Sequence, residues 1–290
     1  MPDFWSHIIA GQEMVEKSHK KRLIKVMEEN RELFNFGCQG PDFFFYGDFW
    51  PWKKDKKGPD TGVKLHKEKT AELIFESIKY LKSIYNDNNS KGERYSEKFL
   101  AYMSGFIAHY ALDMKTHPFI FEKAGEGDNH KKMEMNLDID LMQKKWQLDP
   151  QSISPLKAFN LGKELPEYII DYYFFILNKL FSEKIDKKYI NKCYEDFKRF
   201  HSIFYSPQNT KYKMIKMIDN FISMDLTIYS YSEKNEAHFL STDDYSKFYD
   251  RYNEAVKEGV RLYQVIFNYL NNQISENGLK KEIPDKSFLA

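Results

Sequence analysis

The sequence is poor in residues that break helices and in residues that crosslink chains. Glycine and proline number only 13 and 10 in 290 residues, and no useful stretch alternates apolar and polar residues as a half-buried strand does. The two cysteines, Cys38 and Cys193, form no CxxC motif and no disulfide framework, which favours a reducing compartment. These absences argue for an all-α protein that is held together by its core.

Two further absences restrict the location and the partners. No run of about 18 apolar residues could span a membrane, and the first residues lack the basic region of a signal peptide, so we expect a cytoplasmic protein. The 44 basic and 43 acidic residues give a net charge of only +1. Because no overall field attracts anions, we expect no stable nucleic-acid partner, and any attraction for an anionic substrate must be local.

Apolar and aromatic residues at helical spacing predict a large helical core. Hydrophobic residues make up 42% of the chain and aromatic residues 17%, which argues against disorder. The pattern predicts a first helix, capped by Asp3 or Ser6, that runs to about Lys17, and an apolar central helix over 95–116 that ends before Pro118. Further helices are expected over 20–34 and 63–85, from about residue 130, and near 164–182, 187–205, 210–230 and 243–274.

The segments between these helices are expected to be irregular. Residues 34–62 should form a long loop with a short helix inside it, residues 86–93 a linker, and the tail 280–290 a frayed end. A boundary near residue 150 is one interpretation. In that case 1–150 would be a metal-binding domain, and 151–290 a helical region packed on it as one unit.

The strongest chemical pattern lies on the predicted central helix. His109 and Asp113 are four residues apart and share one helical face, and His117 follows one turn later. A buried carboxylate needs a partner, and this helix carries no lysine or arginine from Leu100 to Met114. An ordinary ion pair between His109 and Asp113 is the simple alternative, but a metal ion explains all three groups together.

Five more residues extend this set of candidate ligands: His7, Asp42, His66, and the pair His130 and Glu134, again four residues apart. Nitrogen together with carboxylate oxygen favours Zn²⁺ over Mg²⁺ or Ca²⁺. Eight ligands are too many for one tetrahedral zinc, so the sequence predicts two or three ions. The remaining histidines have no partner at ligand spacing and are interpreted as structural: His19, His201 and His238.

The order of these residues resembles that of the zinc-dependent phospholipase C family and of the related single-strand nucleases of the S1/P1 type. In those proteins an early His, a loop Asp and a His precede a His-x3-Asp…His segment and a His-x3-Glu pair. This sequence has His7, Asp42, His66, His109-x3-Asp113-x3-His117 and His130-x3-Glu134. The phrases GPDFFFY and GFIAHYALDMKTHP also resemble the intracellular bacterial branch, described as phospholipase C/D-like. The resemblance covers roughly residues 1–145 and implies a multi-helix phospholipase C/P1 nuclease-like bundle.

Carried over position by position, the resemblance implies three zinc sites. The first would take Asp42, His66, His109 and Asp113, the second His117, His130 and Glu134, and the third His7 with Asp113 as a bridge. Secreted members complete the third site with the amino group of a processed N-terminal Trp. This chain begins Met-Pro-Asp, so Pro2 or Asp3 would have to substitute. The segment from Asp113 to His117 is also shorter than in the secreted enzymes.

The resemblance implies hydrolysis of a phosphate diester by a metal-activated water, with Asp42 as proton acceptor. Phospholipid is the leading candidate substrate. The alternatives are a single-strand nuclease or phosphatase of the same fold, and a non-catalytic scaffold stabilised by zinc. The aromatic run from Phe43 to Trp52 and the lysines from Lys53 to Lys57 would either form core and solvated loop, or contact a headgroup, a base or a membrane surface. The oligomeric state is not defined by the sequence.

Overall fold

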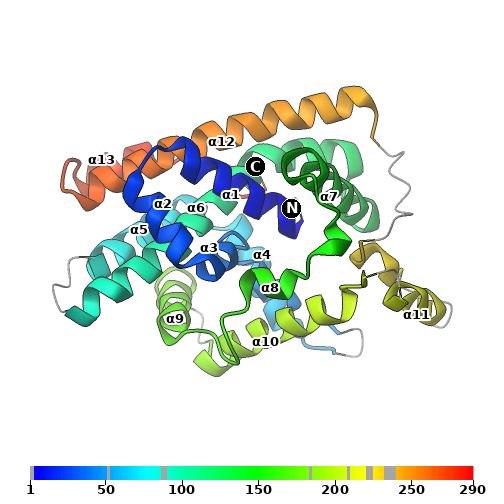
Figure 1. Cartoon of the computed structure of the whole chain (residues 1–290). Coiled ribbons are helices and arrows are strands. Elements are labelled where there is room, and N and C mark those ends of the chain that lie inside the picture. Colours follow the sequence, from blue (N-terminus) through cyan, green and yellow to red (C-terminus); the bar gives the residue numbers. More distant parts are fainter. Residues whose placement is uncertain are drawn as a thin grey trace.

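The computed structural model describes residues 3–50, 53–85, 90–182, 185–207, 210–219, 225–231 and 240–289. Within these ranges every regular element is helical and no strand occurs, which confirms the predicted all-α class. Figure 1 shows the long helix α12 crossing one side of the molecule, above the helices of the first half. In this view both ends of the chain are marked near the middle of the molecule.

The first half contains α1 (Phe4–Lys17), α2 (Lys21–Glu29), α3 (Arg31–Gly37), the 3-10 helix η1 (Asp42–Tyr46), α4 (Lys57–Lys67), α5 (Thr70–Tyr85), α6 (Ser90–Ala124), α7 (Asp128–Leu141) and the π-helical turn η2 (Met142–Trp146). The second half contains η3 (Pro150–Ser152), α8 (Pro155–Phe159), α9 (Glu167–Phe181), α10 (Lys187–Phe204), α11 (Thr210–Asp219), η5 (Leu226–Tyr229), α12 (Thr242–Leu270) and α13 (Glu276–Glu282).

Helix α6 is the centre of the fold. It packs against α1, α2, α3, α5, α7 and α12, and every residue from 99 to 114 is buried. A helix that is apolar over most of its surface must be covered on most sides, which explains why six helices surround it. His109 and Asp113 therefore lie inside the molecule rather than on a surface stripe.

The expected end of this helix before Pro118 is wrong. α6 continues for six residues beyond Pro118, to Ala124. Proline costs an interior helix about 3 kcal/mol, but Phe119 and Ile120 are buried here, and Lys123 pairs with Asp244 of α12 at 2.7 Å. Burial and pairing beyond the proline outweigh the missing hydrogen bond.

Three other predicted boundaries also differ from the structure. The helix expected over 20–34 is interrupted at Asn30, whose φ of −132° and ψ of 45° are not helical. The helix expected over 63–85 is two helices, separated where Lys69 adopts a φ of +50°. The apolar period continues through both breaks, so periodicity alone does not reveal them. Because α4 begins at Lys57 and α3 extends to Gly37, the loop expected over 34–62 is shorter at both ends.

The prediction of a frayed tail is wrong as well. α13 is followed by a segment in which Ile283 and Phe288 are buried, and Phe288 packs inside the molecule against α6. The predicted linker 86–93 lies partly outside the described residues, and so do 220–224 of the helix expected over 210–230. No described helix is both long and apolar enough to cross a lipid bilayer. The proposed boundary near residue 150 stays a prediction.

Candidate metal centre

The structure gathers the eight predicted ligand residues into two neighbouring groups of side chains. We call His7, Asp42, His66, His109 and Asp113 the inner group, and His117, His130 and Glu134 the outer group. They come from α1, the start of η1, α4, α6 and α7. His66 lies in the last turn of α4, and not at the start of a helix as the sequence suggested.

In the inner group the nitrogen and oxygen atoms face one another at close range. His66 Nε2 lies 3.0 Å from Asp42 Oδ1, His109 Nε2 lies 3.2 Å from Asp113 Oδ2, and His7 Nε2 lies 3.4 Å from Asp113 Oδ1. The four bonds of a tetrahedral zinc, each about 2.0–2.1 Å long, hold their ligand atoms about 3.3 Å apart. These separations match the edges of zinc tetrahedra.

His109 connects two possible sets of inner ligands. Its Nε2 atom is close to His7 and Asp113 on one side and to Asp42 and His66 on the other, with 3.7 Å to Asp42 Oδ1. One imidazole nitrogen can coordinate only one ion, whereas a carboxylate has two oxygens and can bridge. The geometry is therefore compatible with one ion bound through His109 and a second bound at His7, with Asp113 shared between them.

The outer group lies one turn further along α6. His130 Nε2 is 2.9 Å from Glu134 Oε1, and the imidazoles of His117 and His130 stack with centroids 5.9 Å apart. The side chain of His130 is 13% exposed, and the exposed loop 125–127 lies just before α7, which carries it. The outer group is therefore the part of the centre that meets solvent.

Backbone carbonyls orient four of the five histidines. The Nδ1 atoms of His66, His109, His117 and His130 lie 2.7, 3.1, 2.9 and 2.7 Å from the carbonyl oxygens of Gly62, Cys38, Phe288 and Gly125. A carbonyl only accepts, so each Nδ1 carries the proton and each Nε2 keeps its lone pair for another partner. This arrangement is the usual one for histidines that bind metal through Nε2.

The lone pairs of the inner group find no other partner among the described residues. His66 Nε2, His109 Nε2 and both oxygens of Asp113 are buried and form no hydrogen bond. Both ring nitrogens of His7 are also without one, so His7 lacks the backbone anchor of the other four. Buried polar atoms left unsatisfied are costly, and a cation at their midpoint would satisfy them together. The residues present therefore fit zinc.

The protonation states are also those that a cation needs. Burial lowers the pKa of His7 to about 3 and that of His130 to about 4, and it holds the pKa of His117 well below its ordinary value. Burial alone would raise the pKa of Asp113, but three neighbouring imidazoles outweigh it, and the pKa is lowered. At neutral pH these histidines are neutral and Asp113 is charged, so a cation displaces no proton from them. His109 differs, because Asp113 and Asp42 overcome the effect of burial and raise its pKa.

A glycine turn presents Asp42 to the inner group. Gly40 has a φ of +51°, and a Cβ at this position would lie 2.4 Å from Cδ2 of His109. The Tyr173 hydroxyl of α9 donates to the Gly40 carbonyl at 2.9 Å. The turn is therefore held by Tyr173 from the second half of the chain, and it packs directly on the imidazole of His109.

Asp138 and Lys131 support the N-terminal end of α1. Asp138 is fully buried and accepts hydrogen bonds from the backbone N–H groups of Trp5 and Ser6 at 2.8 and 2.7 Å. It takes over the capping role predicted for Asp3 or Ser6, and it holds the turn that carries His7. Asp3 makes no capping bond and instead pairs with Lys131 at 3.0 Å. Pro2, the other expected substitute at the third zinc site, lies outside the described residues.

The aromatic run after Asp42 mainly builds core. Phe43 and Phe44 are fully buried, and the ring of Phe45 lies 5.0 Å from that of His66. Lys56 Nζ donates to the carbonyls of Asp48, Phe49 and Trp50, so this lysine closes the loop. Trp52 and His238 lie outside the described residues, and His201 is buried among aromatic rings.

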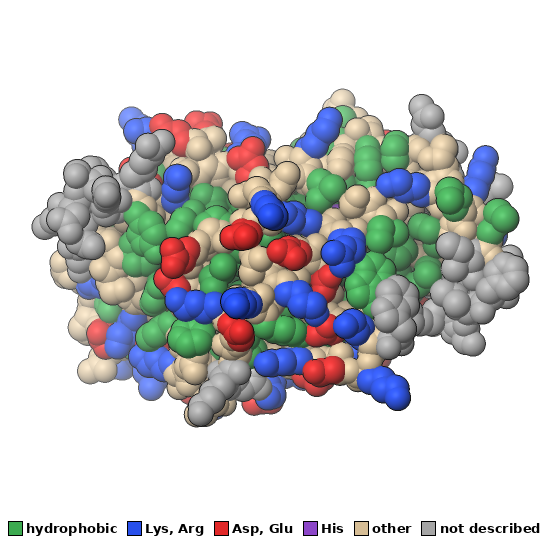
Figure 2. All heavy atoms as spheres, turned by 90° about the horizontal axis from the view of Figure 1, so that it is seen from below, with side chains coloured by type: hydrophobic (Ala, Val, Ile, Leu, Met, Phe, Trp, Pro, Cys, Tyr) green, Lys and Arg blue, Asp and Glu red, His purple; other side chains and the backbone are tan. Residues whose placement is uncertain are grey.

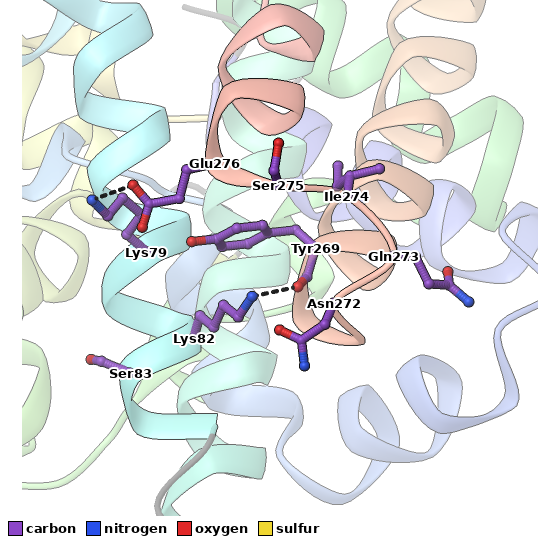
Figure 3. A pocket seen from close by; sticks show the side chains of 9 residues that line it. All are labelled: Lys79, Lys82, Ser83, Tyr269, Asn272, Gln273, Ile274, Ser275 and Glu276. Atoms are coloured by element: carbon purple, nitrogen blue, oxygen red, sulfur yellow. Dashed lines mark hydrogen bonds and ion pairs between the residues drawn. The ribbon is translucent and has the colours of Figure 1, made fainter.

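A surface hollow of about 560 Å³ lies between α5 and the turn from α12 to α13 (Figure 3). Its two lysines are already engaged, Lys79 with Glu276 at 2.9 Å and Lys82 with the Tyr269 carbonyl at 2.9 Å. None of the eight ligand residues lines this hollow. The candidate metal ligands therefore lie in the inner and outer groups, and this hollow is not part of the metal centre.

Comparison with known families agrees with this geometry. The family model of zinc-dependent phospholipase C matches residues 6–196, about two thirds of the chain. The chain belongs to the zinc-dependent phospholipase C family, as the resemblance predicted. No curated protein and no solved structure matches it. Family and site together make it a metal-dependent hydrolase of the zinc class.

The sequence did not reveal the residues that orient the ligands. The carbonyls of Cys38, Gly62, Gly125 and Phe288 carry no sequence signal, because every residue has a carbonyl. Asp138 had a signal, since it continues the spacing of His130 and Glu134 by four residues. That spacing indicated a shared helix face but not the contact with α1.

Proposed function

We propose that the protein hydrolyses phosphate diesters, with phospholipid as the leading substrate, at a centre of two or three zinc ions. The observation that carries this proposal is the inner group, where buried imidazole and carboxylate atoms face one another without any other partner. Bound zinc would supply Lewis acidity, which activates water and stabilises negative charge on a phosphoryl group. The remaining steps are assigned to side chains of this chain.

We assign different roles to the inner and the outer group. The inner group, almost fully buried, would hold its ions permanently. The outer group, exposed through His130, would receive the phosphate. Asp42 is proposed as the proton acceptor, because its side chain keeps 9% exposure while one oxygen faces His66 and His109. Its other oxygen would take the proton from the attacking water.

The nearly neutral net charge of +1 argues against a polyanion as the main substrate. Figure 2 shows basic and acidic side chains intermixed on the face toward α9 and α10, and the described residues of this face form no continuous basic patch. Binding to nucleic-acid backbones needs clustered positive charge. We therefore place phospholipid ahead of single-stranded nucleic acid, and peripheral contact with a membrane is part of the proposal. The cytoplasm is the proposed compartment, supported by two buried free thiols.

The test combines metal content with activity. Purified protein should contain at least two zinc ions per chain and hydrolyse bis-nitrophenyl phosphate and short-chain phosphatidylcholine. A chelator should abolish the activity and added zinc should restore it. Preferential cleavage of single-stranded DNA would favour the nuclease alternative. Zinc-loaded protein that leaves every ester intact, while zinc raises its melting temperature, would identify a scaffold instead.

A further inference from the structure

The carbonyl that orients His117 comes from the far end of the chain. His66 and His130 use carbonyls four and five residues away, and His109 uses Cys38 within the first half. His117 Nδ1 instead contacts the carbonyl of Phe288, 171 residues away, at 2.9 Å. Phe288 lies well beyond residue 196, where the family match ends. This contact is therefore not part of what the family model describes.

Residues 283–289, here the C-terminal segment, are attached to the centre at several points. The backbone N–H of Phe288 donates to the carbonyl of His66 at 3.2 Å. The Tyr110 hydroxyl, next to His109 on α6, lies 3.1 Å from the carbonyls of both Pro284 and Lys286. The segment thus connects the last turn of α4, which carries His66, to the two turns of α6 that carry His109 and His117.

The side chain of Phe288 closes the space behind the ligands. It is fully buried, and its ring centroid lies 4.9 Å from that of His66 and 5.5 Å from that of His109. The ring thus covers part of these two imidazoles and excludes water there. A low dielectric there strengthens every interaction of the ligand atoms with a cation.

We propose that the C-terminal segment is a positioning element of the metal centre, with Phe288 as its anchor. Its carbonyl fixes the Nδ1–H tautomer and the ring direction of His117, so the outer ion is held tightly only while the segment is docked. This proposal rests on the proposed zinc centre. It adds that residues outside the matched family region control metal retention in the outer group.

The test measures zinc affinity by competition with a coloured chelator, for both groups separately. In the wild-type protein we expect a tight class of sites and a second, weaker class. Phe288→Ala should weaken the second class about 10-fold or more, the range typical of lost partners of metal-binding histidines. A chain that ends at Glu282 should show the same loss or a larger one. Lys286→Ala is the matched control, because its side chain is exposed and its carbonyl stays in place, and it should bind zinc like the wild type.

A second variant and a second readout separate positioning from mere packing. Tyr110→Phe keeps the buried ring but removes the hydroxyl that holds Pro284 and Lys286, and it should weaken the same class by a smaller factor. Cobalt-substituted Tyr110→Phe, which keeps the Phe288 ring against His66 and His109, should show a changed visible spectrum for the weaker class only. Phe288→Leu, which restores an apolar anchor, should recover most of the affinity.

The possible outcomes separate a failure of the positioning role of Phe288 from a failure of the proposed zinc centre. Wild-type protein that binds no zinc would contradict the zinc centre itself. Wild-type protein that binds zinc, with unchanged affinity in Phe288→Ala and Tyr110→Phe, would overturn the positioning role alone. A fall in melting temperature that is equal with and without zinc, at unchanged affinity, would show that Phe288 only packs.

Discussion

The inner and outer groups contain the same kinds of side chain but lie in different surroundings. The inner residues come from four separate helices, and their side chains are at most 9% exposed. The outer residues come from the end of α6 and from α7, beside an exposed loop, and His130 reaches solvent. Under the proposed function, the inner group would stabilise the fold by holding its ions, and the outer group would exchange ligands. Four predictions test this difference.

The largest effect is expected from Asp113→Ala. Asp113 faces three imidazoles, and breaking a buried charge cluster typically costs about 3–5 kcal/mol. We expect the loss of at least one zinc per chain, a clear fall in melting temperature and no measurable hydrolysis. Metal analysis and thermal melting check this. Asp250→Ala, at an exposed position on α12, is the control. Unchanged zinc content in Asp113→Ala would contradict the bridging role.

The next prediction compares one histidine from each group. His66→Ala should lower the activity, and it should lower the free energy of unfolding by about 3–5 kcal/mol. The reason is that the buried Asp42 loses its closest partner. His130→Ala should lower kcat/KM by about 100-fold or more, yet cost only about 1 kcal/mol in stability, since water can reach and replace this partly exposed ring. Equal destabilisation by the two variants would remove the proposed distinction between the groups.

Gly40→Ala should disturb the inner group alone. The new Cβ would meet the His109 ring at 2.4 Å in a left-handed backbone conformation, a strain of about 1–3 kcal/mol. We expect weaker binding of the inner zinc and a lower melting temperature. Gly127→Ala is a matched control, because Gly127 also has a positive φ but nothing within 4 Å of its Cβ position. An inner zinc affinity equal in the two variants would show that the contact is unimportant.

The smallest effect is the pH dependence of the metal-free protein. The folded state lowers the pKa of His130 to about 4 and that of His7 to about 3, so the unfolded chain binds protons first as the pH falls below about 6.5. Stability should therefore decrease on acidification, while the raised pKa of His109 opposes part of this. Urea unfolding at pH 7 and pH 5 measures the slope.

His130→Gln should reduce that slope by up to about 1.4 kcal/mol per pH unit, because one titrating group is lost. Zinc-loaded protein should resist acid until its histidines release the metal. A slope that is identical in wild type and His130→Gln would mean that His130 is not held neutral by the fold.

The helical class and part of the set of candidate ligands could be predicted from local pattern, because both depend on short spacings. His109 with Asp113 and His130 with Glu134 repeat at one helical turn, and the period of apolar residues marks most helices. The breaks at Asn30 and Lys69, and the passage of α6 through Pro118, could not be predicted in this way. They depend on packing between helices that are far apart in the sequence.

The sequence by itself determined which side chains can bind metal and that the fold around them is helical, since composition and spacing are local properties. Only the tertiary structure decided which ligand atoms meet, which carbonyl orients each histidine, and which group is open to solvent. Two examples show why: Asp138 of α7 accepts a hydrogen bond from the backbone at the start of α1, and the Phe288 carbonyl contacts His117 Nδ1. Their roles arise from backbone groups brought together across more than 130 residues, and no periodicity in the chain encodes such a meeting.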